Sequence, residues 1–268
     1  MNIRNKLFLT ILFVFTSNAI QANENLPSGE QIARNINARD EGISLLRNMQ
    51  MILTDKRGKQ RVRETVSFRK YFGDEKRTVI HYLKPRNVKK TAFLTYDYPE
   101  ADKDDDQWLY LPAMRKVRRI SASDRGDYFL GTDFTYEDIK KESKVTLEDY
   151  TRKTQRKEEL DGISTYVIEA TPVNDETAKE LGYGKVIQWV DNIIWMTRKS
   201  EFYDRKGKLL KTILTKDIKL VDNIWTAHRL EVNNHRTGHK TLFIFSNVQY
   251  DREVSDHVFT QGAIRRGL

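Results

Sequence analysis

Two clusters in this sequence have side chains that could hold a metal ion. His235 and His239 flank Arg236 and Gly238, in a segment with no cysteine. Arginine and glycine are more typical of an exposed turn than of a metal site. Residues 102–106 (DKDDD) form a dense acidic run that could bind Ca²⁺ weakly, but they lack the glycine and glutamate spacing of an EF-hand loop. We therefore expect both segments to be solvated turns and predict no metal site.

Signals for catalysis are weak. The sequence has no Gly-x-Ser-x-Gly elbow, no glycine-rich phosphate loop and no cysteine nucleophile. None of its five histidines is spaced to act as a base beside a nucleophile. We expect a protein that is not an enzyme, with no catalytic residue and no cofactor. A buried Asp/His pair in a cleft would instead support the interpretation that the protein is a hydrolase.

The segment 106–120 (DQWLYLPAMRKVRRI) indicates binding instead, because it places large apolar side chains directly before a basic cluster. An apolar wall beside a cationic rim suits an amphiphile with acyl chains and an anionic head. The predicted cavity wall is Met49, Met51, Phe68, Trp108 and Tyr110. The predicted docking or basic rim is Arg115, Lys116, Arg118 and Arg119. Ordinary core packing and a solvated basic face are the alternatives, and the pattern leaves them open.

Arg47 is the only charged residue on the apolar face of its predicted strand, between Leu45 and Met49. An unpaired arginine inside a core costs several kcal/mol. We expect Arg47 to pair with an acidic or carbonyl group on a lid helix, or to meet the headgroup of a cargo. The alternative is that the strand twists and Arg47 reaches solvent.

The N-terminus predicts export. Arg4 and Lys6 precede an apolar run at 7–15 (LFLTILFVF), and small or polar residues follow it. This order is typical of a secretory signal peptide, here residues 1–22, cleaved after Ala19 or Ala22. The apolar run is too short for a membrane-spanning helix, which needs about 20 residues. We expect a periplasmic protein.

Net charge limits the classes of molecule that the protein is expected to bind, and cysteine content limits the sources of its stability. The chain carries 47 Lys and Arg against 38 Asp and Glu, a net charge of +9, and no cysteine. In an exported protein, this basic surplus favours phospholipid headgroups or acidic faces of membrane proteins over nucleic acid. Stability must come from a core and not from disulfides, and residues 23–268 are numerous enough to form one domain.

Period-2 alternation of apolar and polar residues dominates the rest of the chain. Residues 43–53 and 62–72 alternate around the turn DKRGK, and DRKGK and Asp161-Gly162 mark two more hairpins. Further strands are predicted at 76–84, 91–98, 107–111, 116–121, 145–157, 163–171, 185–191, 209–220, 225–234 and 240–250. Helices are predicted after Ser28 and near Thr132–Ile139. Residues 255–268 are expected to form either a short helix or an irregular segment.

This element order predicts a mainly β (α+β) fold. Strands and helices do not alternate, so a parallel βαβ sheet is not expected. One large curled antiparallel sheet that forms an incomplete barrel, with helices lidding its concave face, fits best.

Residues 106–139 (DQWLYLPAMRKVRRISASDRGDYFLGTDFTYEDI) resemble the signature stretch of the LolA-like outer-membrane lipoprotein-sorting family of Gram-negative bacteria. Four more segments resemble this family in the same order: GKQRVRETVSF, KTAFLTYDY, WVDNIIWMTRKSEFYDRKGKLLKT and DHVFTQGAIRRG. The resemblance implies a periplasmic half β-barrel that carries lipids or acylated lipoproteins between the inner and outer membranes.

The resemblance also implies partners. An accessory role beside an inner-membrane transporter of the RND or MMPL-like kind is expected, with transient membrane contact, a monomeric state and no nucleic acid. Lipoprotein carriers proper are smaller and lack the basic RKVRRI segment, so lipid binding in general is implied more directly than a lipoprotein cargo. An envelope sensor or adaptor, which uses the same fold to contact a protein, is the alternative.

Overall fold

The structure is a computed structural model that describes residues 26–100 and 103–268. The predicted signal peptide, residues 1–22, lies outside the described residues. Within them, no helix is both long and apolar enough to cross a membrane.

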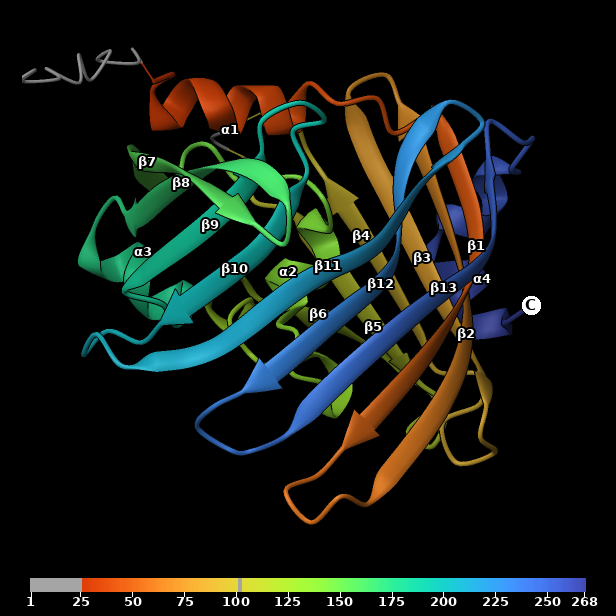
Figure 1. The fold of residues 1–268 in the computed structure, drawn as a ribbon. Coiled ribbons are helices and arrows are strands. Elements are labelled where there is room, and N and C mark those ends of the chain that lie inside the picture. Colours follow the sequence, from red (N-terminus) through yellow and green to blue (C-terminus); the bar gives the residue numbers. More distant parts are fainter. Residues whose placement is uncertain (1–25, 101–102) are drawn as a thin grey trace, which may run out of the picture.

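One antiparallel sheet of thirteen strands forms the body of the described chain (Figure 1). The strands lie in the order β6-β5-β4-β3-β2-β1-β13-β12-β11-β10-β9-β8-β7, and the sheet curls without closing, so β6 and β7 are its edges. This confirms the predicted incomplete barrel. The bounds are β1 Ser44–Thr54, β2 Gln60–Phe72, β3 Glu75–Lys84, β4 Ala92–Asp97, β5 Asp106–Leu111, β6 Lys116–Ile120, β7 Tyr150–Leu160, β8 Ile163–Pro172, β9 Lys185–Asp191, β10 Thr197–Tyr203, β11 Leu209–Val221, β12 Ile224–Asn234 and β13 Lys240–Tyr250.

Short helices cover parts of both faces of the sheet. The helix α2 (Tyr136–Lys141) lies inside the curl, α1 (Gly29–Asn37) runs along one rim, and α4 (Gln261–Arg266) packs outside (Figure 1). The others are α3 (Asp175–Leu181) and the 3₁₀ turns η1 (Ala122–Asp124), η2 (Phe129–Gly131) and η3 (Asp256–Phe259).

Strand β4 shows why several strands are apolar on both sides. Phe93 is fully buried against the rings of Phe129 and Tyr136 inside the curl, at centroid distances of 4.9 and 5.5 Å. Its neighbour Leu94 points to the other face and packs in a cluster with Ile264 of α4. Successive side chains of a strand alternate between faces. A strand that is covered on both faces therefore has a continuous run of apolar residues in its sequence.

The helix starts follow from local capping. Ser28 caps α1 by accepting a hydrogen bond from the Gln31 amide, as predicted. Helix α2 begins later than Thr132, because Thr132 donates its hydroxyl to the Phe129 carbonyl while Thr135 forms a capping box with Asp138. Helix α3 is an addition to the predicted elements, and β10 is the first strand of the hairpin predicted at DRKGK, where it pairs with β11.

The largest departure from the sequence prediction concerns residues 145–149. A strand is predicted over 145–157, but β7 begins only at Tyr150. The preceding residues leave the sheet and cross toward the end of α1, where the Val145 amide donates to the Asn37 side chain. This detour brings part of the chain over the concave face.

Candidate ligand-binding pocket

The concave face holds a pocket of about 240 Å³ between α2 and the inner sides of several strands. Its apolar lining comes from strands distant in sequence and includes Met49 of β1, Ile213 of β11, Leu230 of β12, and Phe243 and Phe245 of β13. Inward residues recur at every second position of a strand, so the strands that cross the pocket present a shared apolar wall.

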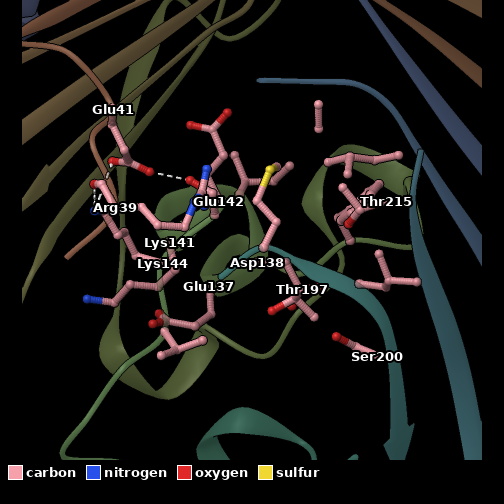
Figure 2. A pocket seen from close by; sticks show the side chains of 18 of the residues that line it. Arg39, Glu41, Glu137, Asp138, Lys141, Glu142, Lys144, Thr197, Ser200 and Thr215 are labelled. Atoms are coloured by element: carbon pink, nitrogen blue, oxygen red, sulfur yellow. Dashed lines mark hydrogen bonds and ion pairs between the residues drawn. The ribbon is translucent and has the colours of Figure 1, made fainter. Parts of the chain in front are cut away.

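Charged side chains gather on one side of this pocket. Figure 2 shows Arg39, Glu41, Lys141, Glu142 and Lys144 together. They come from the loop after α1 and from the end of α2 with the residues after it. The pocket therefore has an apolar part and a charged part, as an amphiphile has.

Residues 142–146, here named the closing segment, are tied to the loop after α1. The Lys144 ammonium donates to the Asn37 and Arg39 carbonyls at 2.6 and 2.9 Å. Asn37 also exchanges two hydrogen bonds with the Val145 backbone, at 2.8 and 2.9 Å. The closing segment thus lines the pocket while Lys144 and the Val145 backbone are bonded on the side of α1.

Arg47 joins the closing segment to the sheet. Its guanidinium forms an ion pair with Glu142, the residue that follows α2, and lies 4.0 Å from the centroid of the Phe245 ring. The Arg47 and Glu142 side chains are 13% and 23% exposed, so the pair is shielded from solvent. Arg47 therefore has an acidic partner at the end of the helix inside the curl.

Glu41 is the centre of a second polar network. Its carboxylate accepts hydrogen bonds from Arg69 at 3.1 Å, from the Tyr71 hydroxyl at 2.9 Å and from Ser143 of the closing segment. Burial alone would raise the pKa of Glu41. The nearby charges of Lys76, Arg69 and Lys144 outweigh it and lower the pKa from 4.5 to about 2. Glu41 is therefore an ionised group that holds a loop, a strand and the closing segment together.

The five predicted cavity residues are not brought together. Met49 lines the pocket. Met51 belongs to the same hydrophobic core cluster as Met49 and is fully buried. Its sulfur accepts a hydrogen bond from the Tyr82 hydroxyl at 3.5 Å. Phe68, Trp108 and Tyr110 pack in the cluster that contains Phe259 and Ile264 of the C-terminal helical turns.

The placement of the last three residues corrects the predicted cavity wall. Trp108 and Tyr110 share one face of β5, whereas Leu109 belongs to the core cluster inside the curl. Both faces of β5 are apolar, so alternation separates the two sets of side chains without telling which set faces the pocket. The aromatic set faces the C-terminal segment.

The predicted basic residues lie together at an edge of the sheet and do not line the pocket. Lys116, Arg118 and Arg119 belong to the edge strand β6, and Arg115 has a positive φ of 51° in the turn before it. Arg118 pairs with Asp124 at 3.3 Å and Arg119 with Asp106 at 2.6 Å, with both arginine side chains more than 60% exposed. Charged residues on an edge strand also discourage pairing with another chain.

Several pocket residues have no signal in the sequence. Glu41 and Glu142 lie in irregular segments where no periodicity assigns a direction to a side chain. Thr197 and Ser200 lie on β10, whose seven residues TRKSEFY are mostly polar. Among the described residues, no group of three or more His, Asp or Glu could hold a metal ion.

Comparison with known proteins identifies similar chains. A family model described as an uncharacterized protein matches residues 74–266. An outer membrane lipoprotein-sorting protein domain from Vibrio parahaemolyticus is 33% identical, with a TM-score of 0.80 over 89% of this chain and 98% of that one. A DUF1329 family protein from Desulfovibrio piger is 30% identical, with a TM-score of 0.80 over 88% and 97% of the two chains.

A more distant structure shares the fold. A LolA superfamily protein from Nitrosomonas europaea is 20% identical, with a TM-score of 0.66 over 88% of this chain and 99% of that one. The search of curated proteins gives no match.

We predict that Glu41 makes the free energy of unfolding depend on pH in the acid range. A carboxyl whose pKa falls on folding stabilises the native state above its unfolded pKa, near 4.5, and this contribution disappears as the pH falls through about 2. The lowered pKa corresponds to about 3 kcal/mol. In urea unfolding, Glu41→Gln should lose about this free energy at pH 7, and its deficit relative to wild type should shrink between pH 4.5 and 2.

The matched control is Glu64→Gln, which removes a carboxylate that is 43% exposed and pairs with Lys84 on the surface. Its unfolding free energy should stay within about 1 kcal/mol of wild type at every pH. A constant deficit for Glu41→Gln across the pH range would contradict the assignment.

Proposed function

We propose that this chain, which belongs to the LolA-like family of outer-membrane lipoprotein-sorting proteins, is a periplasmic carrier that binds lipids or lipoproteins without catalysis. The observation that carries the proposal is the pocket on the concave face, with an apolar wall and a charged closing segment. The similar lipoprotein-sorting domain from Vibrio parahaemolyticus supports it.

The proposed cargo lays its acyl chains against the apolar wall. Each buried methylene contributes about 0.8 kcal/mol, so ten would contribute about 8 kcal/mol before the costs of association. Pockets for small ligands usually measure about 300–1,000 Å³, and this one measures about 240 Å³. A long chain therefore requires the closing segment to move outward. Among the predicted cavity residues, Met49 is the one placed to contact such a chain, and its flexible thioether adapts to varied shapes.

Location and partners complete the proposal. The order of residues 1–22 supports export with a cleaved signal peptide. We propose a monomer that contacts membranes transiently and receives or delivers cargo beside an inner-membrane transporter of the RND or MMPL-like kind. Arg115, Lys116, Arg118 and Arg119 would provide the docking surface, because they form an exposed basic group on one sheet edge.

The first prediction from this proposal concerns the pocket. Ile213→Trp fills the apolar part of the lining, so protein purified from the periplasmic fraction should carry less co-purified lipid, measured by mass spectrometry of the extract. Its affinity for a fluorescent fatty acyl probe should fall about tenfold, a loss of roughly 1.4 kcal/mol.

Leu214→Trp is the matched control, because the adjacent residue of β11 points to the other face and does not line the pocket. It should bind lipid and probe like wild type. If a folded Ile213→Trp protein retains full lipid content and probe affinity, or if the wild type carries no lipid and binds no probe, the carrier proposal fails.

A second prediction concerns Arg47 as the contact that holds the closing segment. In Arg47→Met, the pair with Glu142 is lost, so the segment should open more often and release a bound acyl probe to acceptor vesicles about tenfold faster. Glu142→Gln should have the same effect, and the double variant should be no faster than either, because both changes remove one interaction.

Lys84→Met serves as the control, since Lys84 makes its ion pair with Glu64 on the surface. Its release rate should equal that of wild type. Unchanged release in both Arg47→Met and Glu142→Gln, with folding kept, would show that the pair does not control access.

A third prediction concerns the basic edge. Changing Arg115, Lys116, Arg118 and Arg119 to Gln should weaken binding to phosphatidylglycerol vesicles, and wild-type binding should fall with salt, because exposed charges are screened over about 8 Å at physiological ionic strength. The melting temperature should change little, since exposed charges add about 0–1 kcal/mol each to stability.

The control changes four other exposed cations, Lys56, Arg57, Lys59 and Arg61, around the β1–β2 turn. It has the same net charge as the first quadruple variant and should bind vesicles nearly as wild type does. Equal weakening in both variants would attribute binding to overall charge and exclude a docking role for the β6 edge.

A further inference from the structure

The charges that line the pocket are already paired within the protein. Eleven charged residues line it, and nine of them make ion pairs. The two without an ion pair among the described residues are Arg39 and Asp40, at the rim where a second depression adjoins the pocket. The interior of the pocket therefore offers a ligand few free charges.

Some neutral polar side chains in the same pocket have no hydrogen-bond partner within the described part of the chain. Four of them, here named the polar strip, line it from the neighbouring strands β9, β10 and β11: Gln188, Thr197, Ser200 and Thr215. None makes a side-chain hydrogen bond to another residue in the described part of the chain. By contrast, the hydroxyl of Thr226, also in the lining, bonds to the Ile224 carbonyl and the Tyr250 hydroxyl, each at 2.9 Å.

The polar strip is continuous across the three strands. Ser200 stands opposite Gln188 in the β10–β9 register. Thr215 lies two residues beyond Ile213, which is the partner of Ser200 on β11. Side chains at such direct and diagonal positions lie within about 4.5–8 Å of each other. Figure 2 shows Thr197, Ser200 and Thr215 on the side of the pocket away from Arg39 and Lys144.

Burial makes this arrangement informative. Ser200 is 7% exposed and lines the pocket, so its hydroxyl is accessible to whatever fills the pocket. An acyl chain placed there would displace water without replacing the hydrogen bonds of that water, which is unfavourable, and a wall that only held acyl chains would gain from apolar residues at these positions. The hydroxyls of serine and threonine and the amide of glutamine both donate and accept, which matches ester and amide carbonyls and neutral hydroxyls.

We infer that the polar strip binds the uncharged linkage region of an acylated ligand, that is, the ester or amide carbonyls and adjoining hydroxyls from which its acyl chains extend. This inference rests on the carrier function proposed above and names the ligand class within it. Val186, Met196, Phe202 and Ile213 surround the strip in the lining, so a carbonyl placed there has apolar surface on its sides for the attached chains.

The inference predicts a chemical preference among ligands with the same chain. Monopalmitoylglycerol has an ester carbonyl and two hydroxyls, its alkyl ether analogue lacks the carbonyl, and palmitate has only a charged head. Displacement of a fluorescent acyl probe should show that wild type binds the ester about tenfold more tightly than palmitate, with the ether between them. In the double variant Ser200→Ala, Thr215→Val, the ester and palmitate should bind within about twofold of each other, and palmitate affinity should be that of wild type.

Thr171→Val is the matched control, because it removes the hydroxyl of an exposed threonine on β8 that does not line the pocket. It should keep the full preference for the ester. Circular dichroism and the melting temperature establish that each variant is folded, and Gln188→Leu provides an independent test if the double variant is not.

The outcomes separate this inference from the carrier function. If wild type binds palmitate as tightly as the ester, or if the folded variants keep the preference, the polar strip binds only water and the inference is overturned while the carrier stands. If no acylated probe binds to wild type, both proposals fail.

Discussion

The neutralisation of buried cations on the inner side of the sheet is the constraint on which the pocket depends. Arg69 and Lys76 are each at least 95% buried, and an unpaired charge there would cost several kcal/mol. Glu41 and Asp97 supply the opposite charges, at 3.1 Å in both cases. Lys141 of α2 also pairs with Asp97, so the same carboxylates that permit charged strands also fix the helix and the closing segment over the concave face. The pocket is the space that remains between this charged framework and the apolar wall.

The sequence predicts the framework of strands well, because the information is local. Alternation, the DKRGK and DRKGK turns and the Ser28 cap each involve residues close in the chain, and the structure has strands, hairpins and a helix at those places. Residues close in the chain do not determine which face of a strand points inward. On β5 the choice between Trp108 and Leu109 depends on where α4 packs, more than 140 residues later in the chain. A strand that is apolar on both faces contains no signal for that choice. The direction in which Phe68 points is undetermined by the sequence for the same reason.

The site shows the same limit for polar residues. Arg47 is noticeable from sequence because it interrupts an apolar face, and its partner Glu142 is not, because Glu142 follows a short helix in a segment without periodicity. Gln188 and Ser200 look like ordinary polar positions on half-exposed strands until the register pairs them inside the pocket. Physical reasoning from sequence thus finds a residue that violates a local pattern. It misses residues that become unusual only through contacts between distant strands.

A carrier must release its ligand as well as bind it, and the closing segment bears on that balance. Ten buried methylenes would contribute about 8 kcal/mol, whereas breaking a partly buried ion pair by separating its partners costs several kcal/mol. In the proposed carrier, loading and release both require Arg47 to separate from Glu142, so the cost of breaking this ion pair adds to the barrier in each direction. The pair therefore keeps a loaded chain from escaping before the protein meets an acceptor. A pocket without such a pair would open more often and lose its chain on the way, so a charged closing segment over an apolar wall fits transfer better than free exchange.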